Sequence, residues 1–96
     1  MVAENGYVPQ NIALTTFTLP VSAAFGDEYY IAGFGSGGWT ISQNAGQSIV
    51  VGLATSSVGV SGSVSSSFRQ DSIVLMCVQA NTVFKALDWQ GNLVVV

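Results

Sequence analysis

Apolar and polar residues alternate along several short stretches of this chain of 96 residues, and residues that favour turns separate these stretches. An alternation with a period of two is typical of β-strands that bury one face. The 3.6-residue period of an amphipathic helix is not found along the chain. The pattern predicts less than about 10% helix and strands over residues 11–19, 28–34, 39–43, 47–53, 72–79, 82–89 and 92–96.

The segments between these strands complete the expected domain. Residues 54–67 contain seven serines and two glycines, and they predict either a long ordered loop or two weak strands. Residues 44–46 separate two alternating stretches and predict a β-hairpin. Residues 1–10 carry turn signals and predict an N-terminal tether. We expect one domain over residues 11–96, an all-β, small antiparallel β-sandwich or jelly-roll-like fold of about seven or eight short strands.

The stretch 73–78 is apolar on both faces. One face carries Ile73, Leu75 and Cys77, and the other carries Val74, Met76 and Val78. A strand with two apolar faces is buried on both sides, so its second face meets something outside its own sheet pair, or the strand is central in a closed barrel. The alternation also predicts a buried core that contains Ile41, Ile49, Val51, Leu75, Cys77 and Phe84.

Charged residues are scarce, at 7% of the chain with a net charge of −3, where a typical soluble domain has about 25%. Arg69 and Lys85 are the only cations, which excludes the basic surface that a nucleic-acid partner requires. The apolar run 73–78 is far shorter than the ~20 residues of a spanning helix, so we expect no membrane insertion. So few charges favour a subunit of a larger assembly over a monomer with a Ser, Thr and Asn surface.

Candidate chemistry is limited because the chain has no histidine. This excludes Ser-His and Cys-His nucleophiles and histidine metal sites. Cys77 lies in an apolar alternation and is expected to be a small buried hydrophobe rather than a nucleophile. Asp27 and Glu28 are neighbours that face opposite ways in a strand, and Asp71 beside Arg69 is expected to form a solvated pair. We therefore expect no enzyme activity and no metal site.

Residues 33–38, Gly-Phe-Gly-Ser-Gly-Gly, match the pattern G-x-G-x-x-G. A dinucleotide site requires a helix after this pattern, and the residues that follow are strand-like. The segment is therefore expected to be a glycine-rich β-turn, with no cofactor.

Aromatic and short polar side chains are the candidates for a ligand site. Trp39 and Trp89 are expected to pack in the core, with stacking on a sugar or on a partner side chain as the alternative. Aromatic faces stack on sugar rings, and short polar groups supply directional hydrogen bonds. The candidate glycan-contacting residues are Tyr29, Tyr30, Trp89, Ser56, Ser57 and Asn81.

Several short motifs occur together in a recognisable order. They are TLPVSAAFGD at 18–27, GWTISQNAGQSI at 38–49, DSIVL at 71–75 followed by CV and ANT, and QGNL at 90–93. In this order they resemble a β-structured C-terminal module of tail-fibre and related virion proteins of tailed bacteriophages, over residues 11–96. The resemblance implies a virion location in a phage tail fibre, a homotrimer joined to upstream fibre segments, and attachment to a glycan or protein receptor on the host surface. It supplies no catalytic motif.

The resemblance and the apolar strand together predict an interface. We expect a homotrimer that buries one face of residues 73–78, with the strand at 93–96 beside it. The interface residues are Val74, Met76, Val78, Leu93 and Val95. The alternative is a secreted or cell-surface carbohydrate-binding β-sandwich, which would be a monomer.

Overall fold

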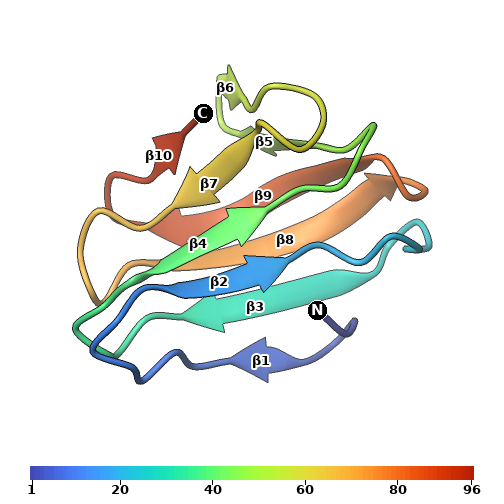
Figure 1. The fold of residues 1–96 in the computed structure, drawn as a ribbon. Coiled ribbons are helices and arrows are strands. Elements are labelled where there is room, and N and C mark those ends of the chain that lie inside the picture. Colours follow the sequence, from blue (N-terminus) through green and yellow to red (C-terminus); the bar gives the residue numbers. More distant parts are fainter.

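Ten strands and no helix make up the domain in the computed structural model, which describes residues 1–96 (Figure 1). The strands are β1 (Gly6–Tyr7), β2 (Thr15–Thr18), β3 (Glu28–Ala32), β4 (Trp39–Ser42), β5 (Ser48–Val51), β6 (Ala54–Thr55), β7 (Ser63–Ser65), β8 (Ser72–Gln79), β9 (Val83–Gln90) and β10 (Val94–Val95). The all-β prediction is confirmed.

The strands form two sheets that pack as a sandwich. The six-stranded sheet has the order β1-β3-β8-β9-β5-β6, and the four-stranded sheet has the order β10-β7-β4-β2. Both sheets are mixed, because β1–β3, β2–β4 and β5–β9 are parallel pairs. The chain changes sheet after each of its first four strands, so β1 and β3 become neighbours with one direction, as do β2 and β4. The sandwich, expected to be antiparallel, therefore contains parallel pairs beside its antiparallel ones.

The segment 44–46 is not the turn of a hairpin. It follows β4 in the four-stranded sheet and precedes β5 in the six-stranded sheet, so it carries the chain from one layer to the other. The predicted hairpin fails because Gln43 and Gln47 are buried and bond to the backbone between the sheets, instead of continuing a strand pair. The domain instead has its long hairpin at β8–β9, which turns at residues 80–82, and a short one at β5–β6.

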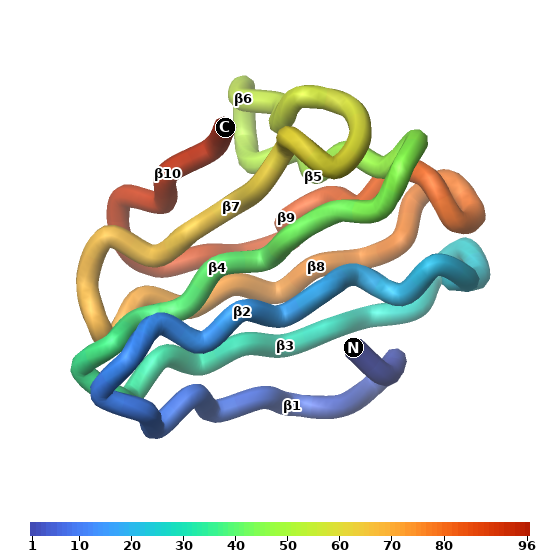
Figure 2. The backbone as a smooth tube through the Cα atoms, in the orientation of Figure 1, coloured from blue at the N-terminus to red at the C-terminus, as the bar shows by residue number.

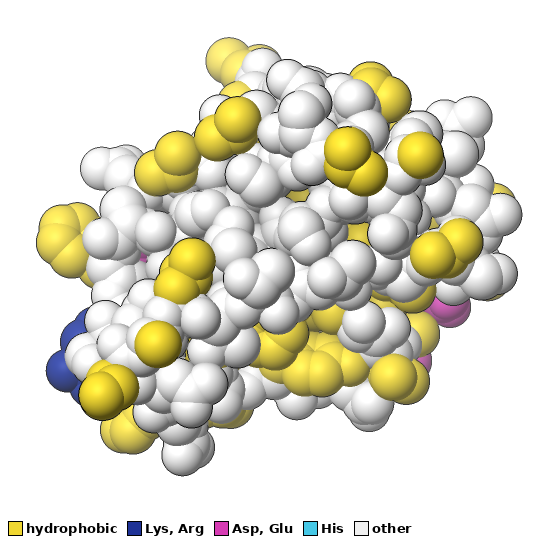
Figure 3. Space-filling model, viewed as in Figure 1, with side chains coloured by type: hydrophobic (Ala, Val, Ile, Leu, Met, Phe, Trp, Pro, Cys, Tyr) yellow, Lys and Arg dark blue, Asp and Glu magenta, His cyan; other side chains and the backbone are white.

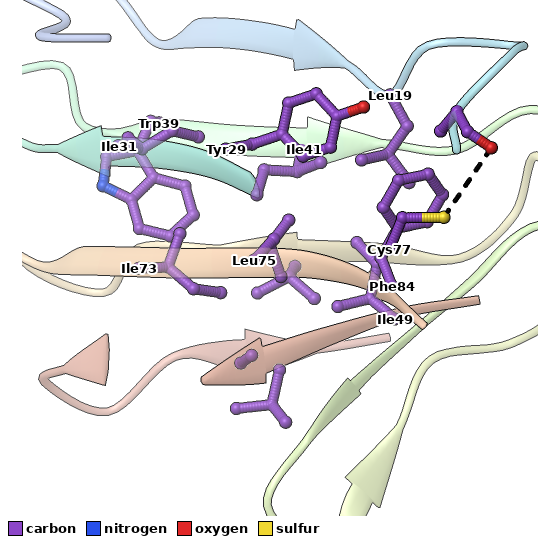
Figure 4. Packing of buried hydrophobic residues seen from close by; sticks show 14 residues of the cluster. Leu19, Tyr29, Ile31, Trp39, Ile41, Ile49, Ile73, Leu75, Cys77 and Phe84 are labelled. Carbon is purple, nitrogen blue, oxygen red and sulfur yellow. Dashed lines mark hydrogen bonds between the residues drawn. The ribbon is translucent and has the colours of Figure 1, made fainter. Parts of the chain in front are cut away.

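The core lies between the two sheets (Figure 4). All six residues expected there are at most 7% exposed, which confirms the assignment of the inward faces. Tyr29 and Phe84 pack with their ring centroids 5.9 Å apart. The Trp39 indole is fully buried, and its Nε1 donates to the carbonyl of Asp71 at 2.8 Å. A buried aliphatic side chain stabilises a domain by about 1.5–3 kcal/mol, so this core is the main source of stability.

Residues 1–10 are part of the domain, which corrects the expected tether. β1 extends the six-stranded sheet beside β3, and Tyr7 packs on Phe17 with centroids 5.3 Å apart. Met1 and Ala3 also contact the core, and Pro9 is buried. Figure 1 shows β1 and β2 at the same lower edge of the two sheets, and the apolar side chains of this edge pack against the core.

The serine-rich segment 54–67 combines both of its predicted structures. It contains the two short strands β6 and β7, with a wide loop between them that Figure 2 shows near the C-terminus. The loop is tied to the last residue of the chain: the Ser57 N–H donates to the Val96 carbonyl at 3.0 Å, and the Val96 N–H donates to Ser63 at 2.9 Å. These bonds close the upper opening of the sandwich.

Candidate functional site

The outer face of the six-stranded sheet carries an apolar stripe on β8. Val74, Met76 and Val78 alternate with the buried residues of this strand, so they point away from the core, and each is only half-buried. We call these three residues the β8 stripe. Their side chains have no second layer of this chain above them, since the four-stranded sheet covers the opposite face.

Charged side chains flank the β8 stripe. Met76 lies in register with Glu28 on β3 and with Lys85 on β9. This row across the outer face therefore carries a carboxylate, a thioether and an ammonium group, in that order. The next row places Val74 between Tyr30 and Asp88.

The β3 flank is held by a hydrogen bond. The Tyr30 hydroxyl donates to Oε1 of Glu28 at 2.5 Å, and this bond raises the pKa of Tyr30 to about 12. The Glu28 N–H donates to Oε1 of Glu4 at 3.2 Å, which ties the N-terminal segment to the same place. The Glu28 carboxylate therefore has a fixed position on the outer face.

The outer face of the four-stranded sheet has a different chemistry. Its outward positions carry hydroxyl groups: Thr16, Thr18, Thr40, Ser42, Ser63 and Ser65. Neighbouring hydroxyls bond to each other across strands, at 3.0 Å between Thr18 and Ser42 and at 2.6 Å between Thr40 and Ser65. Figure 3 shows mostly white surface over these strands, with no dark blue or magenta group at its centre. We call this surface the hydroxyl face.

The five predicted interface residues do not share one surface. The β8 stripe holds three of them, whereas Leu93 and Val95 belong to the other sheet, where they pack against the core. The strand at 93–96 therefore does not lie beside β8, which corrects that expectation. β10 instead pairs antiparallel with β7, with Val95 turned inward and Val94 and Val96 exposed.

The six candidate ligand residues are also dispersed. Tyr29 is buried in the core, where desolvation, with a smaller contribution from Asp27, raises its pKa to about 12. Tyr30 lies on the outer face of the six-stranded sheet, and Trp89, 38% exposed, lies on β9 with its ring against Gly52. Tyr30 and Trp89, the two aromatic candidates outside the core, therefore belong to different strands.

The remaining three candidates gather at one end of the sandwich, around buried amides. The Ser56 hydroxyl donates to Oε1 of Gln43 and accepts from the Ile49 N–H at 2.8 Å. Gln43 Nε2 donates to the carbonyls of Gln47 at 2.7 Å, and of Ser57 and Gly59 at 2.9 Å. These contacts hold β4, β5 and the serine-rich loop together.

Gln47 completes this arrangement on the other side. Its Nε2 donates to the carbonyls of Pro20 at 2.7 Å and Asn81 at 3.1 Å, and its Oε1 accepts from the Asn44 N–H at 2.9 Å. We call Gln43 and Gln47 the amide clasp. The sequence contains a signal for it, since Gln43 falls on the inward face two residues after Ile41, and Gln47 falls on it two residues before Ile49. Polar residues at inward positions predict buried hydrogen bonds, because an unpaired buried amide is costly.

Asp71 is buried, which corrects the expected solvated pair with Arg69. Its Oδ2 accepts from the backbone N–H of Ser67 at 2.9 Å and of Phe68 at 3.1 Å, and from the Ser67 hydroxyl. Arg69 instead donates to the carbonyl of Phe34, at 2.9 and 3.1 Å. The carboxylate therefore orders the turn that leads into β8.

The glycine-rich segment 33–38 packs against backbone. The Gly35 N–H donates to the Pro9 carbonyl at 2.7 Å and the Gly37 N–H to Asn11 at 3.0 Å. A Cβ on Gly37 would overlap the backbone of Ala13. The glycines thus permit two chain segments to run in close contact. Cys77 is fully buried, with its Sγ 3.3 Å from the Gln79 carbonyl.

The monomer offers surfaces rather than cavities. It has no pocket and no group of three or more Cys, Asp or Glu side chains placed to hold a metal ion. It also contains no helix of the length and apolarity that a membrane span needs. Comparisons with protein-family models, with curated proteins and with solved structures find no match to this chain.

Proposed function

We propose that this chain is a non-enzymatic interaction module that forms a homotrimer in a virion protein of the tail-fibre type, where it takes part in attachment to a host surface. The observation that supports this proposal most directly is the β8 stripe. It is an outward-facing apolar strand face in a chain with 7% charged residues. Charge-poor aliphatic surface is typical of obligate interfaces, which resemble a domain core cut in half.

The number of copies comes from the resemblance to tail-fibre modules, whereas the stripe supports association alone. Light scattering on the purified chain tests it: the proposal expects three times the chain mass of 10.0 kDa. Met76→Asp places an uncompensated charge in the stripe and should yield a folded monomer. The matched control is Thr16→Asp on the hydroxyl face, which should remain a trimer. A wild-type monomer, or a Met76→Asp trimer with unchanged melting temperature, contradicts the proposal.

A second candidate function is carbohydrate binding by a monomeric β-sandwich, and the hydroxyl face favours it. This face offers six neutral hydroxyls and no charge, which suits a neutral polyhydroxylated ligand. Binding of neutral polysaccharides by the chain, lost on replacing Thr16 and Thr18 by Val and retained with Met76→Asp, would support this candidate. Unchanged binding in the Thr16→Val, Thr18→Val variant would exclude the hydroxyl face as the site.

A further inference from the structure

At the position of Met76, the two strands beside the β8 stripe carry opposite charges. We call the β3 side and the β9 side of the stripe its two flanks. Glu28 on β3 and Lys85 on β9 are both in register with Met76, on opposite sides of it. Neighbouring strands are about 4.8 Å apart, so these two residues lie about 10 Å from each other across β8. Within one chain the Glu28 carboxylate accepts from the Tyr30 hydroxyl, and Met76 lies between Glu28 and Lys85.

A closed ring of three copies brings different flanks together. A ring with threefold symmetry uses heterologous contacts, in which one surface of a protomer meets a different surface of its neighbour. If the β8 stripes face the axis, the β3 flank of each protomer meets the β9 flank of the next. The acid of one flank and the base of the other then lie at the same level when the strands run along the axis.

We infer that the trimer axis runs parallel to β8 and that Lys85 of each protomer pairs with Glu28 of its neighbour, which closes the apolar centre formed by the β8 stripe. This inference rests on the proposed function, because it assumes three copies. Glu28 suits the pairing, since Tyr30 holds its carboxylate on the outer face. Complementary charges at the rim fix register and partner orientation more than they add affinity.

The stripe also admits dimers. A parallel dimer with its twofold axis along β8 would form the same pairs of Lys85 with Glu28 and is distinguished from the trimer by its mass. An antiparallel dimer forms different pairs. In an antiparallel dimer the β9 flanks of two copies face each other, and Lys85 lies opposite Asp88 of the second copy when the twofold axis crosses β9 midway between these two residues. This contact is isologous and stops at two chains. The parallel and antiparallel arrangements therefore differ in which acid compensates a reversal of Lys85.

The experiment is a set of charge reversals read by light scattering and by sedimentation over a range of concentrations. Lys85→Glu and Glu28→Lys each place like charges side by side, and each should raise the concentration at which the trimer dissociates by about tenfold or more. The double variant Lys85→Glu, Glu28→Lys should restore the trimer to within about threefold of the wild type. Circular dichroism confirms that each variant folds, and Glu28→Gln and Lys85→Gln serve as neutral variants that preserve the side-chain size.

The outcomes separate this inference from the proposed function. Restoration of the trimer in the Lys85→Glu, Glu28→Lys double variant supports the pairing of Lys85 with Glu28 of the neighbouring copy. Restoration instead in Lys85→Glu, Asp88→Lys, with a dimer mass, overturns it in favour of the antiparallel contact. A wild-type trimer that tolerates both single reversals overturns the inference and leaves the proposed function standing. A wild-type monomer overturns both.

Discussion

Removing one side chain of the amide clasp should destabilise the domain far more than removing an exposed glutamine side chain. Gln43→Ala deletes an amide that is 4% exposed and that bonds to three carbonyls and one hydroxyl. The amide has two N–H groups and one acceptor oxygen, so about three hydrogen bonds are lost at a net ~1 kcal/mol each. The orphaned carbonyls cannot all reach water, so we expect a loss of about 3 kcal/mol or more in the free energy of unfolding.

The assay is urea denaturation followed by circular dichroism, with a thermal melt as a second measurement. For a domain of this size, 3 kcal/mol corresponds to a fall in melting temperature of about 12–24 °C. The matched control is Gln70→Ala, since Gln70 is exposed and should change stability by less than about 0.5 kcal/mol. A Gln43→Ala variant as stable as the Gln70→Ala variant would refute the argument that buried amides hold the two sheets together.

Three further predictions concern the core, a turn and titration. Leu75→Ala should cost about 2–5 kcal/mol in denaturant unfolding, because the side chain is fully buried; a cost below about 1 kcal/mol would mean that it does not face the core. Gly91→Ala should cost more than Gly59→Ala: both residues have φ +99, but only a Cβ on Gly91 meets a side chain, the Asp71 carboxylate, and equal melting temperatures would contradict this. The pKa values of Tyr29 and Tyr30 are raised to about 12, from a value near 10 in the unfolded chain. The two protonated hydroxyls therefore make their full contribution to the free energy of unfolding below pH 10, and this contribution is lost as the pH rises to 12. Melts at pH 9 and pH 11 should show a smaller drop in Tyr30→Phe than in the wild type, and an identical drop would argue against the Glu28 bond.

The alternation of apolar and polar residues was enough to predict which face of a strand is buried, but not which strands pair with each other. It predicted the bounds of β8 and the inward positions of Leu75, Cys77 and Phe84, because burial of alternate residues leaves a direct trace in sequence. Strand pairing depends on contacts between distant segments, which leave no such trace. The parallel pairs and the position of β10 were therefore not predicted.

Errors at the polar positions have a common cause. Ser56 and Asp71 were expected at the surface, where short polar groups are most frequent, and Gln43 and Gln47 were placed at the ends of predicted strands with no role assigned to their amides. In this domain they are buried because the connections between sheets leave backbone groups that require partners. The outer-face row of Glu28 and Lys85 was missed for a different reason, since it exists only when β3, β8 and β9 lie side by side.

The order of the strands in the six-stranded sheet has a consequence for folding during synthesis. β3 pairs with β8, and the register partners Ala32 and Ser72 are 40 residues apart. β5 likewise waits for β9, so both central pairings require segments that leave the ribosome late. The β8–β9 hairpin is the longest local pairing, and it supplies the middle of the sheet. Long-range β pairing folds slowly, in milliseconds to seconds. The pairs β1–β3 and β2–β4 can form earlier, but β3 and β5 lack their β8 and β9 partners until this hairpin emerges. The low content of charge makes that interval the one in which the nascent chain is most exposed to aggregation.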